Sequence, residues 1–243
     1  MSMSTNTARR AAPQARRQES RQSIAKFFKF FVGIAMIPAC LGICISTWRI
    51  YLSQYMILRE QLWFIAGFAA YVLIYSVLQN PIKTYVFGHE LSHAIWTWMF
   101  RGKVSNFRAG ASGGSVTVSK TNVFISLAPY FFPVYTVLTV VLYMIAKAFW
   151  KVEPYFEVYR FVLGFTWAFH CVLTVYVLLK GQEDVRENGS VFSIFFICFA
   201  NALCFGLLWV YLSDHVTLTE YFRRLWEQIG FEYSRVFSLS GMK

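Results

Sequence analysis

Long apolar stretches dominate the chain and predict helices that cross a membrane. Six stretches are each close to the roughly 20 residues that a helix needs to span a bilayer. They are residues 27–48, 62–79, 82–101, 123–149, 159–180 and 190–212. The second and third are separated only by Asn80-Pro81, a pair that ends a helix and turns the chain. This pattern predicts an all-α membrane protein with about six transmembrane helices.

Two stretches outside these spans show different patterns. Residues 102–122 are rich in glycine and contain the alternating sequence Ser-Val-Thr-Val-Ser, which predicts a short strand or hairpin. Residues 217–229 begin with Thr217 and Glu220 at capping-box spacing and then place apolar side chains on one helical face. We expect an amphipathic helix there that lies on the membrane surface or packs against a partner.

These features divide the chain into three parts. Residues 1–26 form a basic tail that we expect to be disordered, and residues 27–212 form a polytopic domain whose core is about 82–212. Residues 213–243 form a C-terminal tail with the amphipathic surface helix. The Arg- and Ser-rich start of the tail fits a cytoplasmic segment that fixes topology, with an organelle transit peptide as the alternative.

Composition supports membrane insertion. The chain is 57% apolar and only 14% charged, and it contains 25 Phe, 14 Tyr and 8 Trp, more than a soluble domain of this size buries. Its net charge of +11 fits the positive-inside bias of membrane proteins and attraction to anionic lipid. The charge distribution favours two cytoplasmic termini in a multi-pass protein. Because the basic residues form no single large face, we expect the lipid bilayer and no nucleic acid as a partner.

The third apolar stretch contains the sequence His89-Glu90-Leu91-Ser92-His93, an HExxH motif. Residues four apart share one face of a helix, so both imidazoles can reach one ion. Glu90 is then placed to take a proton from water instead of binding the metal. Ionisable side chains inside a bilayer are costly and typically functional. The motif therefore predicts one Zn²⁺ ion bound by His89 and His93, with Glu90 as the catalytic base.

A catalytic zinc site needs a third protein ligand and an open position for water. Asp184, in the polar turn before the last span, is our preferred third ligand because zinc accepts carboxylates. Asp214 follows the last span and therefore lies at the opposite boundary of the membrane from this turn. Glu183, Glu187 and His170 are the alternatives. For Asp184 to reach the histidines, the turn must enter the membrane, which is allowed where irregular backbone lines a polar cavity.

These motifs together resemble the site-2 protease family of intramembrane zinc metalloproteases. The resemblance covers roughly residues 82–200 and rests on His-Glu-Leu-Ser-His in an apolar span, a Gly-Gly strand, a proline-bearing span and an acidic turn before the last span. Leu127-Ala128-Pro129 matches the Gly-Pro element of the family with Ala in the Gly place. The Asn that the family usually carries in this span has no counterpart within residues 130–142.

The resemblance implies a function and a set of site residues. The family's zinc ligands correspond to His89, His93 and Asp184, and its water-activating Glu corresponds to Glu90. The implied activity is hydrolysis of peptide bonds in a membrane-protein substrate that has a transmembrane helix, by zinc-activated water with Glu90 as general base. The implied fold is a helical membrane bundle with a small β element.

Three further residues are candidates for contact with substrate. A substrate helix must unwind before its carbonyls can be attacked, and the strand that contains Val116 and Val118 can pair with the extended segment. His170, in the middle of the fifth span, is a candidate for holding substrate or an oxyanion, or else a buried structural histidine.

Two other functions remain as alternatives to proteolysis. One is a non-proteolytic membrane scaffold or assembly factor of the same fold. The other is a metal transporter with His89, His93 and His170 along its pathway. The Glu between the two motif histidines favours the protease over both.

Overall fold

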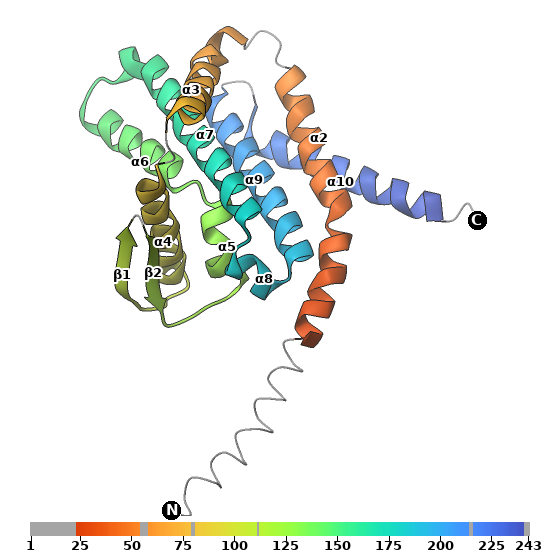
Figure 1. The fold of residues 1–243 in the computed structure, drawn as a ribbon. Coiled ribbons are helices and arrows are strands. Elements are labelled where there is room, and N and C mark those ends of the chain that lie inside the picture. Colours follow the sequence, from red (N-terminus) through yellow and green to blue (C-terminus); the bar gives the residue numbers. More distant parts are fainter. Residues whose placement is uncertain (1–22, 54–57, 79–80, 111, 214–215, 241–243) are drawn as a thin grey trace, which may run out of the picture.

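The computed structural model describes residues 23–53, 58–78, 81–110, 112–213 and 216–240. Most of the expected basic tail, residues 1–22, lies outside the described residues. The described chain is mostly helical and contains one two-stranded sheet (Figure 1). After a helix over residues 23–35, the α-helices are α2 (Ile37–Ser53), α3 (Leu58–Val77), α4 (Ile82–Met99), α5 (Val123–Phe131), α6 (Val134–Phe149), α7 (Phe156–Lys180), α8 (Glu183–Asn188), α9 (Ser190–Leu212) and α10 (Leu218–Ser240).

Three described helices are long and apolar enough to cross a membrane. They cover Ser23–Ile50, Glu153–Lys180 and Ser190–Leu212, and the bent pair α5 and α6 makes a fourth if it is one span. Helix α3 is apolar but shorter, over Gln61–Val77. The structure therefore agrees with membrane association, and the count of six spans stays a prediction.

The expected span over residues 123–149 is divided into two helices. Helices α5 and α6 meet at an angle of 77° around Phe132 and Pro133. Pro133 has no N–H to continue the helical ladder, and its ring disfavours a helical conformation at the residue before it. The apolar pattern runs through this break because both helices are apolar, so hydrophobicity alone did not predict the bend.

The residues after α4 form the expected hairpin. Strand β1 (Val104–Gly110) pairs antiparallel with β2 (Gly113–Val118), with an irregularity in register between Ser105 and Arg108. Both strands lie along α4 (Figure 1). The hairpin therefore places a strand beside the helix that carries the HExxH motif.

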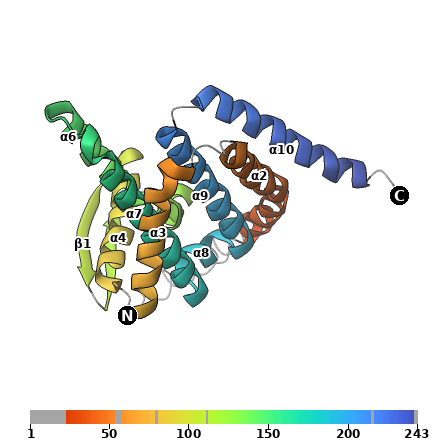
Figure 2. The ribbon, with the colours of Figure 1, turned by 90° about the horizontal axis from the view of Figure 1, so that it is seen from above.

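The last helix is longer than the expected 217–229 and crosses α2 (Figure 2). Tyr221 and Leu225 are buried in a cluster with Ile43 and Ile50 of α2. Trp226 on the same helix is largely exposed. A helix is therefore present where the amphipathic pattern predicted one, α2 covers part of its apolar surface, and its position on a membrane surface stays a prediction.

Another buried cluster positions the polar segment before the last span. It joins α5, α8 and α9 through residues such as Leu127, Tyr130, Val185 and Ile197. Helix α4 packs against α5 in turn. This arrangement brings the polar segment before the last span next to the HExxH helix, although the two are far apart in the sequence.

Candidate metal centre

Three potential ligands converge where α4 meets α8. Ligand atoms of His89, His93 and Asp184 all lie within 4.8 Å of one another. The histidines are one turn apart on α4, and Asp184 lies in the first turn of α8. Their side chains are 13%, 14% and 30% exposed, so the centre is largely shielded but reachable by water. The turn before α9 therefore brings Asp184 to the two histidines, and its role as a metal ligand stays a prediction.

The spacing of the ligand atoms fits a small divalent ion. The two Nε2 atoms are 3.3 Å apart, and two imidazole nitrogens bound to one tetrahedral zinc are separated by about 3.4 Å when each Zn–N distance is about 2.05 Å. The Asp184 Oδ2 atom is 3.7 Å from Nε2 of His89 and 3.8 Å from that of His93. Two imidazoles and one carboxylate are a donor set that suits zinc.

A proline in α5 fixes the orientation of His93. Pro129 lies inside α5 and has no N–H, so the carbonyl of Ile125, four residues earlier, lacks its usual helical partner. His93 Nδ1 donates a hydrogen bond of 2.8 Å to that carbonyl. Because a carbonyl only accepts, Nδ1 carries the proton and the lone pair of Nε2 faces the other ligands.

The remaining ligands also have polar partners. The Tyr85 hydroxyl lies 3.4 Å from Nδ1 of His89, and the Tyr130 hydroxyl donates to Asp184 Oδ2 at 3.0 Å. A carboxylate must be ionised to bind a metal, and the hydroxyl group of Tyr130 stabilises the ionised form of Asp184.

Helix α8 is held in place by Asn188 at its C-terminal end. The Asn188 side chain donates to Ser126 Oγ of α5 at 2.8 Å and to the main-chain carbonyl of Asp184 at 2.9 Å. Gly181 and Gly189 flank the helix with φ values of 74° and 88°, a region that favours glycine. The position of Asp184 is therefore set by the glycines that flank this six-residue helix and by the hydrogen bonds of Asn188 at its C-terminal end.

Glu90 lies beside the ligands but is not one of them. Among the described residues, the candidate metal-binding group comprises the two histidines and Asp184. Glu90 is buried, and its side chain packs against Gly114 of β2, where an added Cβ would lie 2.8 Å from Glu90 Oε1. The absence of a side chain at position 114 therefore makes room for the Glu90 carboxylate between α4 and the hairpin.

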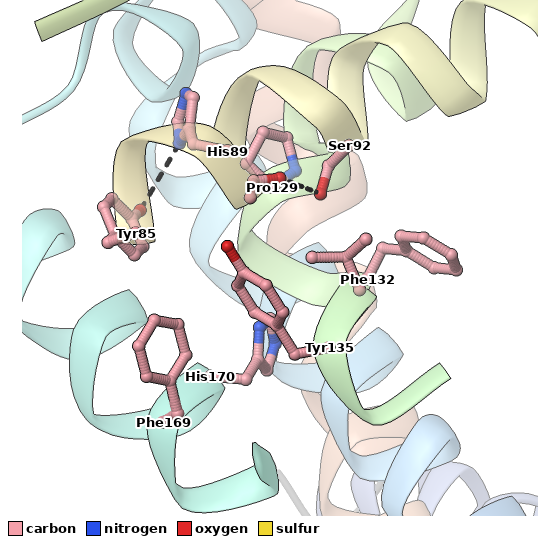
Figure 3. A pocket seen from close by; sticks show the side chains of 10 residues that line it. Tyr85, His89, Ser92, Pro129, Phe132, Tyr135, Phe169 and His170 are labelled. Atoms are coloured by element: carbon pink, nitrogen blue, oxygen red, sulfur yellow. Dashed lines mark hydrogen bonds between the residues drawn. The ribbon is translucent and has the colours of Figure 1, made fainter. Parts of the chain in front are cut away.

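A small pocket extends from His89 towards α7. Its lining includes Tyr85, Pro129, Tyr135 and His170 (Figure 3), and its free volume of about 20 Å³ is enough for one water molecule. Figure 3 shows Tyr135 between the two histidines of the pocket. The Tyr135 hydroxyl donates to the carbonyl of Thr84 on α4 at 2.6 Å, which closes this side of the centre.

His170 is buried and bound to Asn201 of α9. Asn201 Nδ2 donates to the carbonyls of Tyr130 and Ile197, so its Oδ1 is an acceptor for His170 Nε2 at 3.0 Å. In the neutral imidazole, Nδ1 is then an acceptor, which cannot stabilise an oxyanion. This geometry disfavours the oxyanion role for a neutral His170, and the other two roles, contact with substrate or a buried structural histidine, stay predictions.

The other residues predicted from the sequence take separate positions. Among the described residues, Glu183, Glu187 and His170 are not members of the metal-binding group. Val116 and Val118 lie half-buried in β2. Sequence reasoning missed Tyr130, the Ile125 carbonyl and Asn201, and only the proline at position 129 gave a local signal for any of them, because a proline frees a carbonyl four residues earlier.

Comparisons with protein-family models, curated proteins and solved structures give no match to this chain. The assignment of a function therefore rests on the geometry and chemistry of the centre itself.

The carboxylate of Asp184 should be required for metal binding. We expect Asp184→Ala to lose bound zinc, because two imidazoles alone do not complete a zinc site. Elemental analysis of the purified protein measures the effect, with Glu183→Ala as the matched neighbour that retains the ion. Equal zinc contents in the two variants would exclude Asp184 as a ligand.

Pro129 should matter for metal affinity although it does not touch the ion. In Pro129→Ala a restored N–H competes with His93 for the Ile125 carbonyl, and we expect zinc affinity to fall about tenfold, the lower end of measured outer-shell effects. Competition with a chromophoric chelator measures the affinity. Pro133→Ala, at the neighbouring bend, is the control, and an unchanged affinity of Pro129→Ala would contradict the proposed orientation of His93.

Proposed function

We propose that the protein is an intramembrane zinc metalloprotease that hydrolyses peptide bonds of membrane-embedded substrates. The observation that carries this proposal is the convergence of His89, His93 and Asp184 within 4.8 Å, with Glu90 buried beside them and outside the ligand group. A site that only stores or carries metal has no need of a carboxylate that is close to the ligands and does not bind. The proposal includes insertion in a membrane. It assigns no side to the two termini, because the hydrogen bonds from Lys29 to Asn188 and from Cys40 to Phe195 place the first and last spans parallel, whereas six successive spans would place them antiparallel.

Each residue has a distinct part in the proposed reaction. The two histidines and Asp184 hold the ion, which when bound supplies positive charge that acidifies water and stabilises an oxyanion. Glu90 accepts a proton from the attacking water and delivers it to the leaving amine. Its burial between α4 and β2 limits the motion of the carboxylate.

The geometry of the hairpin supports binding of an extended substrate along β2. Ser119 N–H donates to the carbonyl of Lys103, next to the start of β1, at 2.9 Å. Since N–H groups along an antiparallel strand point alternately towards and away from the partner, those of Val118 and Val116 point away from β1, to the edge of β2 where no other described strand pairs (the free edge). Glu90 packs against the same strand at Gly114. A substrate strand added at this edge would therefore run past the catalytic carboxylate.

Glu90→Gln should abolish cleavage while zinc stays bound. The amide preserves the shape of the side chain but cannot accept the proton, so we expect turnover to fall by at least about 100-fold. The assay uses single-span peptides with central Gly-Pro pairs in detergent micelles, with products identified by mass spectrometry. His89→Ala should lose both zinc and activity. Full turnover by Glu90→Gln would contradict the protease, and zinc flux into vesicles would favour the transporter.

Proline at Val116 or Val118 should slow cleavage without releasing zinc. Each substitution removes an N–H that points to the free edge and leaves the pairing with β1 intact. Thr117→Pro is the matched contrast, because the Thr117 N–H faces β1 and its loss should weaken the hairpin itself. Rates and zinc contents are measured for all three variants. Unchanged turnover in Val116→Pro and Val118→Pro would exclude substrate pairing at this edge.

A further inference from the structure

A polar groove lies between α2 and α10, where the last helix crosses the first span (Figure 2). Its volume of about 350 Å³ is in the range of small-molecule sites. We refer to it as the α2–α10 groove. No residue of the candidate metal centre lines it, and its lining residues are Ser46, Arg49, Arg224, Glu227, Gln228 and Phe231.

The two helices that form the groove are in direct contact beside it. A Cβ added to Gly42 of α2 would lie 2.9 Å from the Cα of Ile229 on α10, so the two backbones touch at this point. Ser46 follows Gly42 by about one helical turn. Further along, the Tyr233 hydroxyl donates to the carbonyl of Ala35 at 2.6 Å. The groove is therefore built on a fixed crossing of two helices.

The groove contains a buried hydroxyl group that has no partner. Ser46 is only 4% exposed, and its Oγ makes no hydrogen bond to the part of the chain that the structure describes. A serine inside a helix can donate to the carbonyl four residues earlier, as Ser92 does to Gly88 at 2.8 Å. Because a buried polar group without a partner is costly, the Ser46 hydroxyl indicates a partner from outside this part of the chain.

Arg49 supplies a positive charge that is oriented but not neutralised. Its Nη1 donates to Oε1 of Gln228 at 2.8 Å, and Nε2 of the same amide donates to Glu232 at 2.8 Å. Gln228 is buried and neutral, so it fixes the guanidinium group without cancelling its charge. None of the ion pairs among the described residues includes Arg49. Its remaining N–H groups are therefore available to an anion.

Arg224 adds a second guanidinium group to the same groove. It lies one turn before Gln228 and therefore on the same face of α10. Its Nε donates to Glu220, so this contact does not use its terminal N–H groups. Glu227 is the one acid of the lining, and it already accepts from Arg223 at 2.8 Å. The groove thus presents two guanidinium groups and a hydroxyl group, and its acid is paired elsewhere.

We propose that the α2–α10 groove binds a phosphate group. A guanidinium group can bind a phosphate through two parallel hydrogen bonds, and the other oxygens of the phosphate can accept from Ser46 and from the second arginine. A phosphate held by Arg49 and Arg224 would also join α2 to α10. The proposal uses neither the metal nor the protease activity, so it stands or fails independently of them.

Isothermal titration calorimetry of the full-length protein with inorganic phosphate tests the site, in neutral detergent and a phosphate-free buffer. We expect Arg49→Gln to weaken phosphate binding about tenfold or more, because it removes charge-assisted hydrogen bonds. Arg108→Gln removes the same charge from an exposed position on β1 and should bind phosphate as wild type does.

Ser46→Ala separates loss of a ligand contact from loss of folding. We expect it to weaken phosphate binding about tenfold, the size of a hydrogen bond to a charged group. Without phosphate, its unfolding temperature should equal or exceed that of wild type, because the substitution removes a buried hydroxyl that has no partner. A lower unfolding temperature would show that the hydroxyl has a partner in the protein and would count against the site.

A lipid headgroup and a free ion are two sources of the same phosphate group. Native mass spectrometry with phosphatidic acid and diacylglycerol, which differ by the phosphate, tests the lipid. Binding of inorganic phosphate supports a soluble ligand, and retention of phosphatidic acid over diacylglycerol supports a lipid, provided that Arg49→Gln and Ser46→Ala reduce it. If wild type binds neither, or if both variants bind as wild type does, the proposal is overturned.

Discussion

The hydrogen bond from His93 to the carbonyl of Ile125 is the constraint on which the candidate metal centre depends. It joins the HExxH helix to α5, and it exists because a proline deprives that carbonyl of its helical donor. The N–H that Pro129 lacks thus sets the tautomer of His93. The same helix supplies Tyr130, which orients Asp184, so α5 organises ligands from both α4 and α8 without contributing one.

The local parts of the site were predictable from the sequence, and the long-range parts were not. Two histidines at i and i+4 share a helical face in any α-helix, so their pairing followed from spacing. Asp184 was preferred from its place in the polar turn before the last span, with Glu183 and Glu187 of the same turn as alternatives. The partners of these ligands depend on how α5, α8 and α9 pack, and no local pattern predicts that Asn201 reaches the carbonyl of Tyr130.

The fold shows the same division. Hydrophobic stretches predicted the helices and alternation predicted the hairpin, because each pattern reports which faces of an element are apolar. The hydrophobic pattern of the sequence does not indicate the bend between α5 and α6, because both helices are apolar. Only Pro133 indicates it. The bend also affects the candidate site. It leaves the carbonyl of Tyr130, at the end of α5, open to the hydrogen bond from Asn201.

The two glycines around α8 have a consequence for how this region can change in evolution. With Gly181 and Gly189 in conformations that other residues rarely adopt, the short helix begins and ends at set positions. Each residue of a helix turns the next side chain by about 100°. One inserted or deleted residue would therefore rotate the aspartate away from the histidines, so the length of this connection is as restrictive as the identity of its residues.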